Sequence, residues 1–331
     1  MPREGQLRPH RRSSGGPSGL GSHFRRGGRA GCSPCVMTRK KVPGKPTVEH
    51  RGLSVRDRIQ RRKRLVTEGW RMNVEVVFLP PIATDLPSKL CVVIDVLRAT
   101  STLVSMFEAG AERVTLADSI PKALAYAEGR PVRPLVCGES GGLPPAGFDL
   151  GNSPRLLPAG TMRGREICFC TSNGTKAMLQ VAEAPVVLAG SLLNASAVTR
   201  AAASEARRKG LDIAFVCSGD FLGSKFAVDD AFAAGYLATL LRRESAAGEV
   251  SLDESAVAAV RLYRSYCQEA GSSDPEEDPP REAILRAFWE SHNAQVLRRV
   301  GLAEDVEYCA QMDISIKVPR LRVDDGMMVL L

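Results

Sequence analysis

The sequence predicts an α/β protein with a layered α/β/α architecture around a largely parallel or mixed sheet. Short apolar runs alternate with helical segments from about residue 74 onwards, as expected for strands connected by helices. Several of these runs, such as CVVI at 91–94, are continuously apolar, which is typical of strands covered on both faces. We expect a core at 72–331 made of two α/β halves, about 72–160 and 161–331, with a helical C-terminal region.

The individual elements follow from apolar periodicity and from glycine and proline punctuation. Strands are expected at 74–79, 91–95, 113–116, 134–137, 166–170, 185–188 and 211–217. Helices are expected at 101–109, 120–127, 176–181, 194–209, 229–243, 253–268 and 283–294. The last stretch, from residue 313, returns to strand-like alternation and is expected to pair at a sheet edge or with a second subunit.

The first 71 residues differ from the rest in charge. Residues 1–72 hold 19 Lys and Arg against 4 Asp and Glu, so the remainder of this +8 chain is net acidic. The stretch is rich in Arg, Gly, Ser and Pro without apolar periodicity, and we therefore expect residues 1–71 to be a disordered basic leader. We favour a misassigned start, with Met37 or Met72 as the first residue; a transit peptide or an arm for nucleic acid or anionic membranes is the alternative.

The cysteines and apolar runs predict a cytoplasmic protein. Five of the nine cysteines lie in or beside strand-like runs, which indicates buried free thiols in a reducing compartment. No apolar run reaches 18 residues, so we expect no membrane-spanning segment.

Histidine is scarce, and this narrows the chemistry. The four histidines are at positions 10, 23, 50 and 292, and three of them fall in the leader. A phosphohistidine mechanism, a Ser-His-Asp triad or a histidine-ligated metal would depend on His292 alone. We therefore expect His292 to be a surface or packing residue.

Carboxylates follow several predicted strands. They are Asp95, Glu139, Asp149, Asp229 and Asp230. Carboxyl ends of parallel strands share one edge of a sheet, where ligands bind, so these side chains can converge. Hard oxygen ligands suit Mg²⁺, although one of the last two aspartates is also well placed to cap the helix that begins there.

Hydroxyl- and glycine-rich turns supply the second half of the predicted site. Ser172, Asn173, Gly174 and Thr175 connect a strand to a helix, and Ser218-Gly219 repeats the arrangement. Backbone N–H groups at such a turn favour an anion, although Gly and Asn also mark ordinary turns. With Arg98 nearby, the pattern predicts a site for phosphate and a metal ion.

One alternative concerns Asp95. The stretch VVIDVLRAT is superficially similar to the haloacid dehalogenase pattern, in which an aspartate after an apolar strand attacks phosphorus. The usual second acid is replaced by Leu97, which removes the general acid of that mechanism. Because no suitable histidine is present, we favour in-line attack by a carboxylate-oriented water, and a phospho-Asp95 intermediate is the main rival.

Taken together, five motifs resemble the 2-phosphosulfolactate phosphatase (ComB-like) family. The motifs are IDVLRATST (94–102), GES with GFDLGNSP (138–140 and 147–154), TSNGTKA (171–177), CSGDFLGSKFAVDDAFAAG (217–235) and GLAEDVEYCAQMD (301–313). The resemblance implies a Mg²⁺-dependent phosphatase that converts 2-phosphosulfolactate to 3-sulfolactate and phosphate. It also implies an α/β homodimer and, in methanogens, a place in coenzyme M biosynthesis.

The resemblance further implies which residues surround the site. They are Asp95, Arg98, Glu139, Asn152, Ser153, Ser172, Asn173, Gly174, Thr175, Ser218, Gly219, Asp229 and Asp230. From their chemistry we expect Asp95, Arg98, Glu139 and Asp229 to be catalytic, and Asp95, Glu139 and Asp230 to hold Mg²⁺. The remaining residues would bind substrate, and Arg98 would make a bidentate contact with phosphate or sulfonate.

Two other classes of function compete with an enzyme. One is a non-catalytic protein that binds sulfolactate or phosphate in the same pocket. The other is a nucleic-acid-associated protein, for which the basic leader offers only a weak, salt-sensitive contact.

Overall fold

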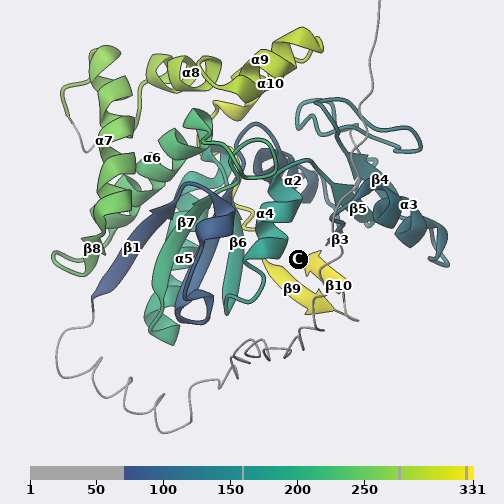
Figure 1. Ribbon diagram of the computed structural model, residues 1–331, viewed down its shortest axis with the longest axis horizontal. Helices are drawn as coiled ribbons and strands as arrows, with labels where there is room; N and C mark the ends of the chain where they lie inside the picture. Colours follow the sequence, from purple (N-terminus) through teal and green to yellow (C-terminus); the bar gives the residue numbers. More distant parts are fainter. Residues whose placement is uncertain (1–70, 159, 275–276, 325–326) are drawn as a thin grey trace, which may run out of the picture. The chain divides into compact units, whose positions relative to one another are not determined.

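Two five-stranded sheets form the framework of the chain in the part that the structure describes (Figure 1). The structure is a computed structural model and describes residues 71–158, 160–274, 277–324 and 327–331. The predicted leader therefore lies outside the described residues, apart from Arg71. The α/β class predicted from the sequence is confirmed.

The first sheet is wholly parallel, with strand order β6-β2-β7-β1-β8. Its strands are β1 (Met72–Val77), β2 (Lys89–Ile94), β6 (Val186–Gly190), β7 (Asp212–Cys217) and β8 (Val250–Leu252). Every residue of β2 is buried, as its central place between β6 and β7 requires.

The second sheet is mixed, with strand order β4-β5-β3-β10-β9. Its strands are β3 (Arg113–Leu116), β4 (Leu135–Gly138), β5 (Glu166–Cys170), β9 (Leu321–Asp324) and β10 (Met327–Leu330). The first three are parallel to one another, and β10 pairs antiparallel with both β3 and β9. The strand-like end of the chain thus pairs within its own subunit, at one side of this sheet (Figure 1).

Helices cover both faces of each sheet. One face of the first sheet packs on α5 (Ala195–Lys209), α6 (Val228–Glu244) and α7 (Glu254–Glu269). Its other face shares a core with the second sheet, to which α2 (Ala99–Glu108) and α4 (Gly174–Gln180) also contribute. The far face of the second sheet packs on α3 (Ile120–Glu128). Each sheet is therefore sandwiched between helices, as the predicted α/β/α layering requires.

The sheets do not follow the division at residue 160. Strands β1 and β2 precede it and lie in the first sheet, whereas β5 follows it and lies in the second. Each sheet therefore takes strands from both sides of that point, and the proposed pair of halves stays a prediction.

The C-terminal region is helical, as predicted, but the predicted bounds of one helix were wrong. The single helix expected at 283–294 is two helices, α8 (Arg281–Trp289) and α9 (His292–Arg299). The break has a local cause, because the Ser291 side chain accepts the Ala294 N–H and so caps α9. A further helix, α10 (Glu304–Cys309), was not predicted. No helix among the described residues is long and apolar enough to cross a membrane.

Candidate active site

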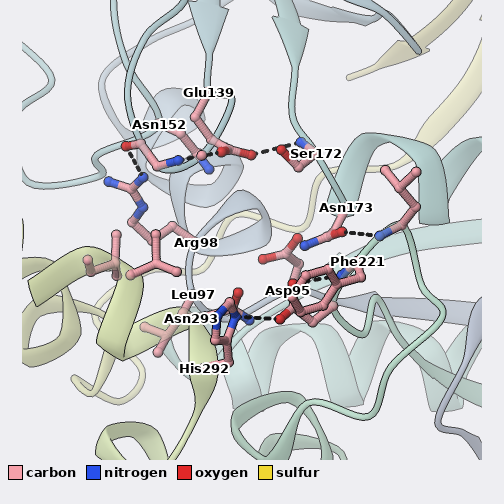
Figure 2. Close-up of a pocket in the computed structure, with 16 residues that line it drawn as sticks. Asp95, Leu97, Arg98, Glu139, Asn152, Ser172, Asn173, Phe221, His292 and Asn293 are labelled. Carbon is pink, nitrogen blue, oxygen red and sulfur yellow. Dashed lines mark hydrogen bonds and ion pairs between the residues drawn. The ribbon is translucent and has the colours of Figure 1, made fainter. Parts of the chain in front are cut away.

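A cavity of about 340 Å³ lies where strand ends from both sheets meet (Figure 2). Its wall is formed by the residues that follow β2, β4, β5 and β7, together with the first turns of α9. The lining residues are Asp95, Leu97, Arg98, Glu139, Gly141, Gly142, Asn152, Ser172, Asn173, Asp220, Phe221, Leu222, His292, Asn293, Val296 and Leu297. The cavity thus lies at the carboxyl edge of the strands, where the sequence predicts the site.

Asp95 is the buried carboxylate that faces this cavity. It directly follows β2, and its Oδ1 accepts the Ala99 N–H at the start of α2, at 3.1 Å. Burial raises the pKa of Asp95 to about 6; the Ala99 hydrogen bond opposes this shift, and the charge of Glu139 adds to it. The site therefore holds a carboxylate whose ionisation is costly without a nearby cation.

Asp229 and Asp230 are buried at the start of α6, close enough to Asp95 for the three charges to repel one another. Neither lines the cavity, and neither caps the helix, whose N-cap residue is Ala227. Burial, with the neighbouring carboxylates, raises the pKa of Asp229 to about 7 and that of Asp230 well above its ordinary value. The ionisation of each of the three aspartates therefore depends on the charge of the other two.

These two aspartates differ in their hydrogen bonds. Asp230 accepts the Val96 N–H at 3.0 Å, the Ser218 hydroxyl at 3.0 Å and the Gly219 N–H at 3.2 Å. It therefore ties the end of β2 to the loop after β7. Asp229 accepts only a long bond from Asn293 through Oδ2, at 3.4 Å, and its buried Oδ1 has no partner among the described residues.

Glu139 connects the ends of β4 and β5. Its Oε1 accepts the Ser172 N–H at 2.7 Å, and its Oε2 accepts the Gly142 N–H at 2.9 Å (Figure 2). A carboxylate has about four lone-pair sites, so these contacts leave both oxygens able to accept more.

The Ser172–Thr175 turn connects β5 to α4, as the sequence predicts, and approaches Asp95 closely. A Cβ atom at Gly174 would lie 2.6 Å from Asp95 Oδ2 and 2.5 Å from the Ala99 Cβ. Only glycine fits here without displacing Asp95 or Ala99. Thr175 is buried behind the cavity, where its hydroxyl bonds to the Thr171 backbone.

Arg98 lies on the cavity wall but is held by other protein groups. Its Nη1 donates to Asp305 Oδ2 at 2.7 Å, and its Nη2 donates to the Gly142 carbonyl at 2.8 Å. The side chains of Arg98 and Asp305 are 2% and 0% exposed. Ser153 donates its hydroxyl to the second oxygen of Asp305 at 2.6 Å, so this serine supports the ion pair rather than lining the cavity.

The predicted residues thus fall into two groups. Those that line the cavity are Asp95, Arg98, Glu139, Asn152, Ser172 and Asn173. Those that lie behind it are Ser153, Gly174, Thr175, Ser218, Gly219, Asp229 and Asp230. Asp149 is held elsewhere, because it pairs with Arg133 and accepts the Val136 N–H on β4.

Sequence reasoning missed several residues that the structure brings to the site. They are Asp220, Phe221, Leu222, His292 and Asn293 on the wall and Asp305 behind it. The expectation for His292, a surface or packing residue, overlooks its position on the cavity wall. One signal was available, because Asp220 and Asp305 fall inside motifs that resemble the family.

The fold and the site together define an α/β protein whose ligand cavity is lined by carboxylates, amides and a buried arginine at the ends of its strands. The model of the 2-phosphosulpholactate phosphatase family matches residues 80–324, which include every residue of this cavity. The chain belongs to this family. The family consists of phosphoric monoester hydrolases, and the chain is an enzyme of that class.

Individual relatives match over most of their length. A probable 2-phosphosulfolactate phosphatase of Carboxydothermus hydrogenoformans is 33% identical over 78% of this chain and 97% of the relative. Proteins described in the same words from Deinococcus radiodurans and Thermus thermophilus are each 38% identical, over 70% and 76% of this chain and 87% and 95% of their own lengths.

Proposed function

We propose that this chain hydrolyses 2-phosphosulfolactate to 3-sulfolactate and phosphate, in a reaction that depends on Mg²⁺. The substrate is the one that the names of its relatives carry. The observation that supports the proposal most is the cavity itself, in which Asp95 faces the space and two further buried aspartates lie behind it. Its volume of about 340 Å³ is near the lower end of the range for ligand pockets, which suits a small substrate.

The negative charges on the cavity wall support the proposal that a cation binds there. The substrate carries phosphate, sulfonate and carboxylate groups, and the wall that would receive it holds Asp95, Glu139 and Asp220. The positive charge of Arg98 is already matched by Asp305. A divalent cation would remove the repulsion between an anionic substrate and an acidic wall.

The residues present fit Mg²⁺ in its usual, partly hydrated form. Among the described residues, no three His, Cys, Asp or Glu side chains form a ready-made metal site. Mg²⁺ commonly uses only one or two carboxylates, with water and substrate oxygens completing its shell. Asp95 and Glu139 would hold it from the cavity wall, and the unpartnered Oδ1 of Asp229 is a further oxygen donor. When bound, the ion would neutralise charge on the transferring phosphoryl group.

The other lining residues have roles that their contacts permit. Asn152 is 4% exposed, and its buried Oδ1 has no partner among the described residues, so its amide is available to a substrate. Arg98 uses two of its five N–H groups on Asp305 and Gly142, and the others are left for an anion. We propose direct attack by a carboxylate-oriented water, with phospho-Asp95 as the rival intermediate.

The test is phosphate release from synthetic 2-phosphosulfolactate and from a panel of small phosphate esters, with Mg²⁺ or with EDTA. The proposal predicts turnover with Mg²⁺, loss with EDTA and recovery when Mg²⁺ is restored. Turnover that EDTA leaves intact would remove the metal from the proposal. Binding of 3-sulfolactate in calorimetry without hydrolysis of any ester would instead indicate a binding protein.

The remaining proposals concern the setting of the enzyme. We propose a reducing cytoplasm, supported by seven free, buried cysteines in the described residues. A homodimer is a further proposal, and we expect no nucleic-acid binding beyond a weak contact of the basic leader. Sedimentation tests the homodimer. The salt dependence of DNA binding tests the leader.

A further inference from the structure

An Asp-His pair lies on the cavity wall, apart from the carboxylates that would hold the cation. His292 Nδ1 and Asp220 Oδ2 are 2.6 Å apart (Figure 2). Both residues line the same cavity as Asp95, although 72 positions separate them in the sequence. Of the two ring nitrogens, Nε2 has no protein hydrogen-bond partner within the part of the chain that the structure describes.

The imidazole is held in place from several sides. Its ring stacks on Phe221, with 5.2 Å between centroids and 29° between planes. The Lys225 ammonium lies 4.1 Å from the centroid of the Phe221 ring, and backbone bonds between Asp220 and Lys225 close the loop that carries Phe221. On the helix side, the Ser291 cap fixes the first turn of α9, where His292 is the first residue. Together, these contacts limit the orientations that the His292 ring can adopt.

The pair has the arrangement of a proton donor. A carboxylate can only accept a hydrogen bond, so Asp220 places a proton on Nδ1. The tautomer and the ring plane are then fixed, and Nε2 is left to carry or release the second proton. A proton donor must also lie near the reacting group, and His292 meets this condition because it lines the cavity.

The proposed reaction needs a proton donor of this kind. Hydrolysis of an alkyl phosphate expels an alkoxide, which is a poor leaving group unless it gains a proton as the bond to phosphorus breaks. Asp95 and Glu139 on the wall would hold the cation, which leaves the proton donor to another residue. His292 is the only histidine after the leader, and one histidine is sufficient for a general acid.

We propose that His292 is the general acid of the phosphatase reaction and that Asp220 is its positioning residue. The water oxygen forms a bond to phosphorus, and the bond from phosphorus to the ester oxygen breaks with its electron pair on that oxygen. The oxygen takes the Nε2 proton of the imidazolium and leaves as a hydroxyl group. The proton lost by the attacking water returns through solvent to the imidazole, so the enzyme is regenerated. This inference rests on the proposed phosphatase function.

The competing explanation is structural, because His292 also supports the loop through its stacking with Phe221. The variants His292→Phe and His292→Gln separate the two roles. Phenylalanine retains a ring to stack on Phe221, whereas glutamine retains hydrogen bonding without a proton to give. If the ring only supports the loop, His292→Phe retains activity; if the ring donates a proton, neither variant does.

The experiment measures kcat and KM for 2-phosphosulfolactate in the full-length wild-type enzyme and both variants, with Asp118→Asn as a control. Asp118 pairs with Lys122 at the surface, away from the cavity. Loss of a general acid is expected to lower kcat by about 10²-fold or more in both variants while KM changes only a few-fold. A raised KM with an unchanged kcat, or wild-type kcat in His292→Phe, would overturn the proposal.

A leaving-group comparison gives an independent readout. p-Nitrophenolate leaves readily without a proton, so the loss of kcat on p-nitrophenyl phosphate should be much smaller than on the alkyl ester. Equal losses on both esters would contradict an acid role. If the wild type hydrolyses no phosphate ester, the proposed function itself fails; if it does and the variants match it, only the assignment of His292 fails.

Asp220 is tested by its own pair of variants. Asp220→Asn retains the side-chain shape but removes the charge, and Asp220→Glu restores it. A positioning role predicts a loss of kcat in Asp220→Asn, with the same leaving-group dependence as in the His292 variants, and partial recovery in Asp220→Glu. Wild-type kcat in Asp220→Asn would remove Asp220 from the proposal.

Discussion

Arg98 on the cavity wall and Asp305 behind it form a buried ion pair. The side chains of Arg98 and Asp305 are 2% and 0% exposed, and Arg98 Nη1 lies 2.7 Å from Asp305 Oδ2. The Ser153 hydroxyl donates to the other carboxylate oxygen of Asp305. An ion pair so deeply buried is sensitive to the loss of either partner, because the remaining charge has no water to solvate it.

Replacing Asp305 by alanine is therefore expected to lower the free energy of unfolding by about 3–5 kcal/mol, since it leaves a buried guanidinium unpaired. Urea denaturation measures the change. The control is Asp118→Ala, which breaks an exposed pair and is expected to cost less than about 1 kcal/mol. Equal costs in the two variants would show that the buried pair adds nothing to stability.

Some residues of this site were predictable from the sequence, and others were not. Asp95, Glu139 and Asn173 stand at strand ends, where chain order and the α/β pattern locate them. Asp305 and His292 come from the helical C-terminal region, and their contact with the site depends on tertiary packing over long separations. Asp305 is 207 positions from Arg98, and no periodicity in the sequence indicates that contact.

At the scale of elements, the approach of α4 to the end of β2 sets the position of Asp95. Helix α4 can begin there only because Gly174 has no side chain: a Cβ would meet Asp95 and Ala99 at 2.6 Å and 2.5 Å. Such distances are closer than van der Waals contact, so either the helix or the carboxylate must move.

Gly174→Ala is accordingly expected to cost about 1–3 kcal/mol of stability and to lower kcat by displacing Asp95. Gly151→Ala is the matched control, because its new methyl group would be no closer than 3.5 Å to Pro144. Thermal unfolding and phosphate release measure the two effects. Wild-type kcat in Gly174→Ala would mean that Asp95 does not depend on this contact.

Most elements were predictable because their local signals agree with the fold. Strands β3 and β5 have the predicted bounds, and the hydroxyl turn does connect β5 to α4. The break between α8 and α9 was not predicted, because the apolar pattern continues across it and the Ser291 cap decides the matter. The short strand β8 and helix α10 were missed as well, and β8 is defined by its pairing with β1.

At the scale of the whole molecule, the core keeps its thiols buried. The seven cysteines among the described residues are all free and buried. Burial raises the pKa of Cys91, Cys137 and Cys168 to about 12 and that of Cys170 to about 11. These thiols stay protonated in the folded protein at pH values where an unfolded thiol, with a pKa of about 8.5, ionises.

Two outcomes follow for a Cys32→Ser, Cys35→Ser variant, which removes the cysteines outside the described residues. A chromogenic disulfide reagent at about pH 8 should label none of the seven thiols in the folded protein and all of them in urea.

Above about pH 8.5 the unfolded state binds fewer protons than the folded state, so the free energy of unfolding should fall as pH rises. Rapid labelling of the folded protein would contradict this burial.

The division of the strands between two sheets could not be read from the sequence. Alternating strands and helices predict α/β layers but not strand order, which depends on packing between distant segments. As a result, the cavity wall is formed by residues that follow β2 and β7 of one sheet and β4 and β5 of the other.

The proposed hydrolysis of phosphate esters depends above all on Asp95. The most direct measurement is phosphate release from 2-phosphosulfolactate with Mg²⁺ in the wild type, in Asp95→Asn and in Asp118→Asn, a surface control, with folding checked by circular dichroism. We predict that Asp95→Asn folds and loses activity by about 10²-fold or more, whereas Asp118→Asn retains it. Full activity in a folded Asp95→Asn enzyme would show that the hydrolysis does not depend on Asp95.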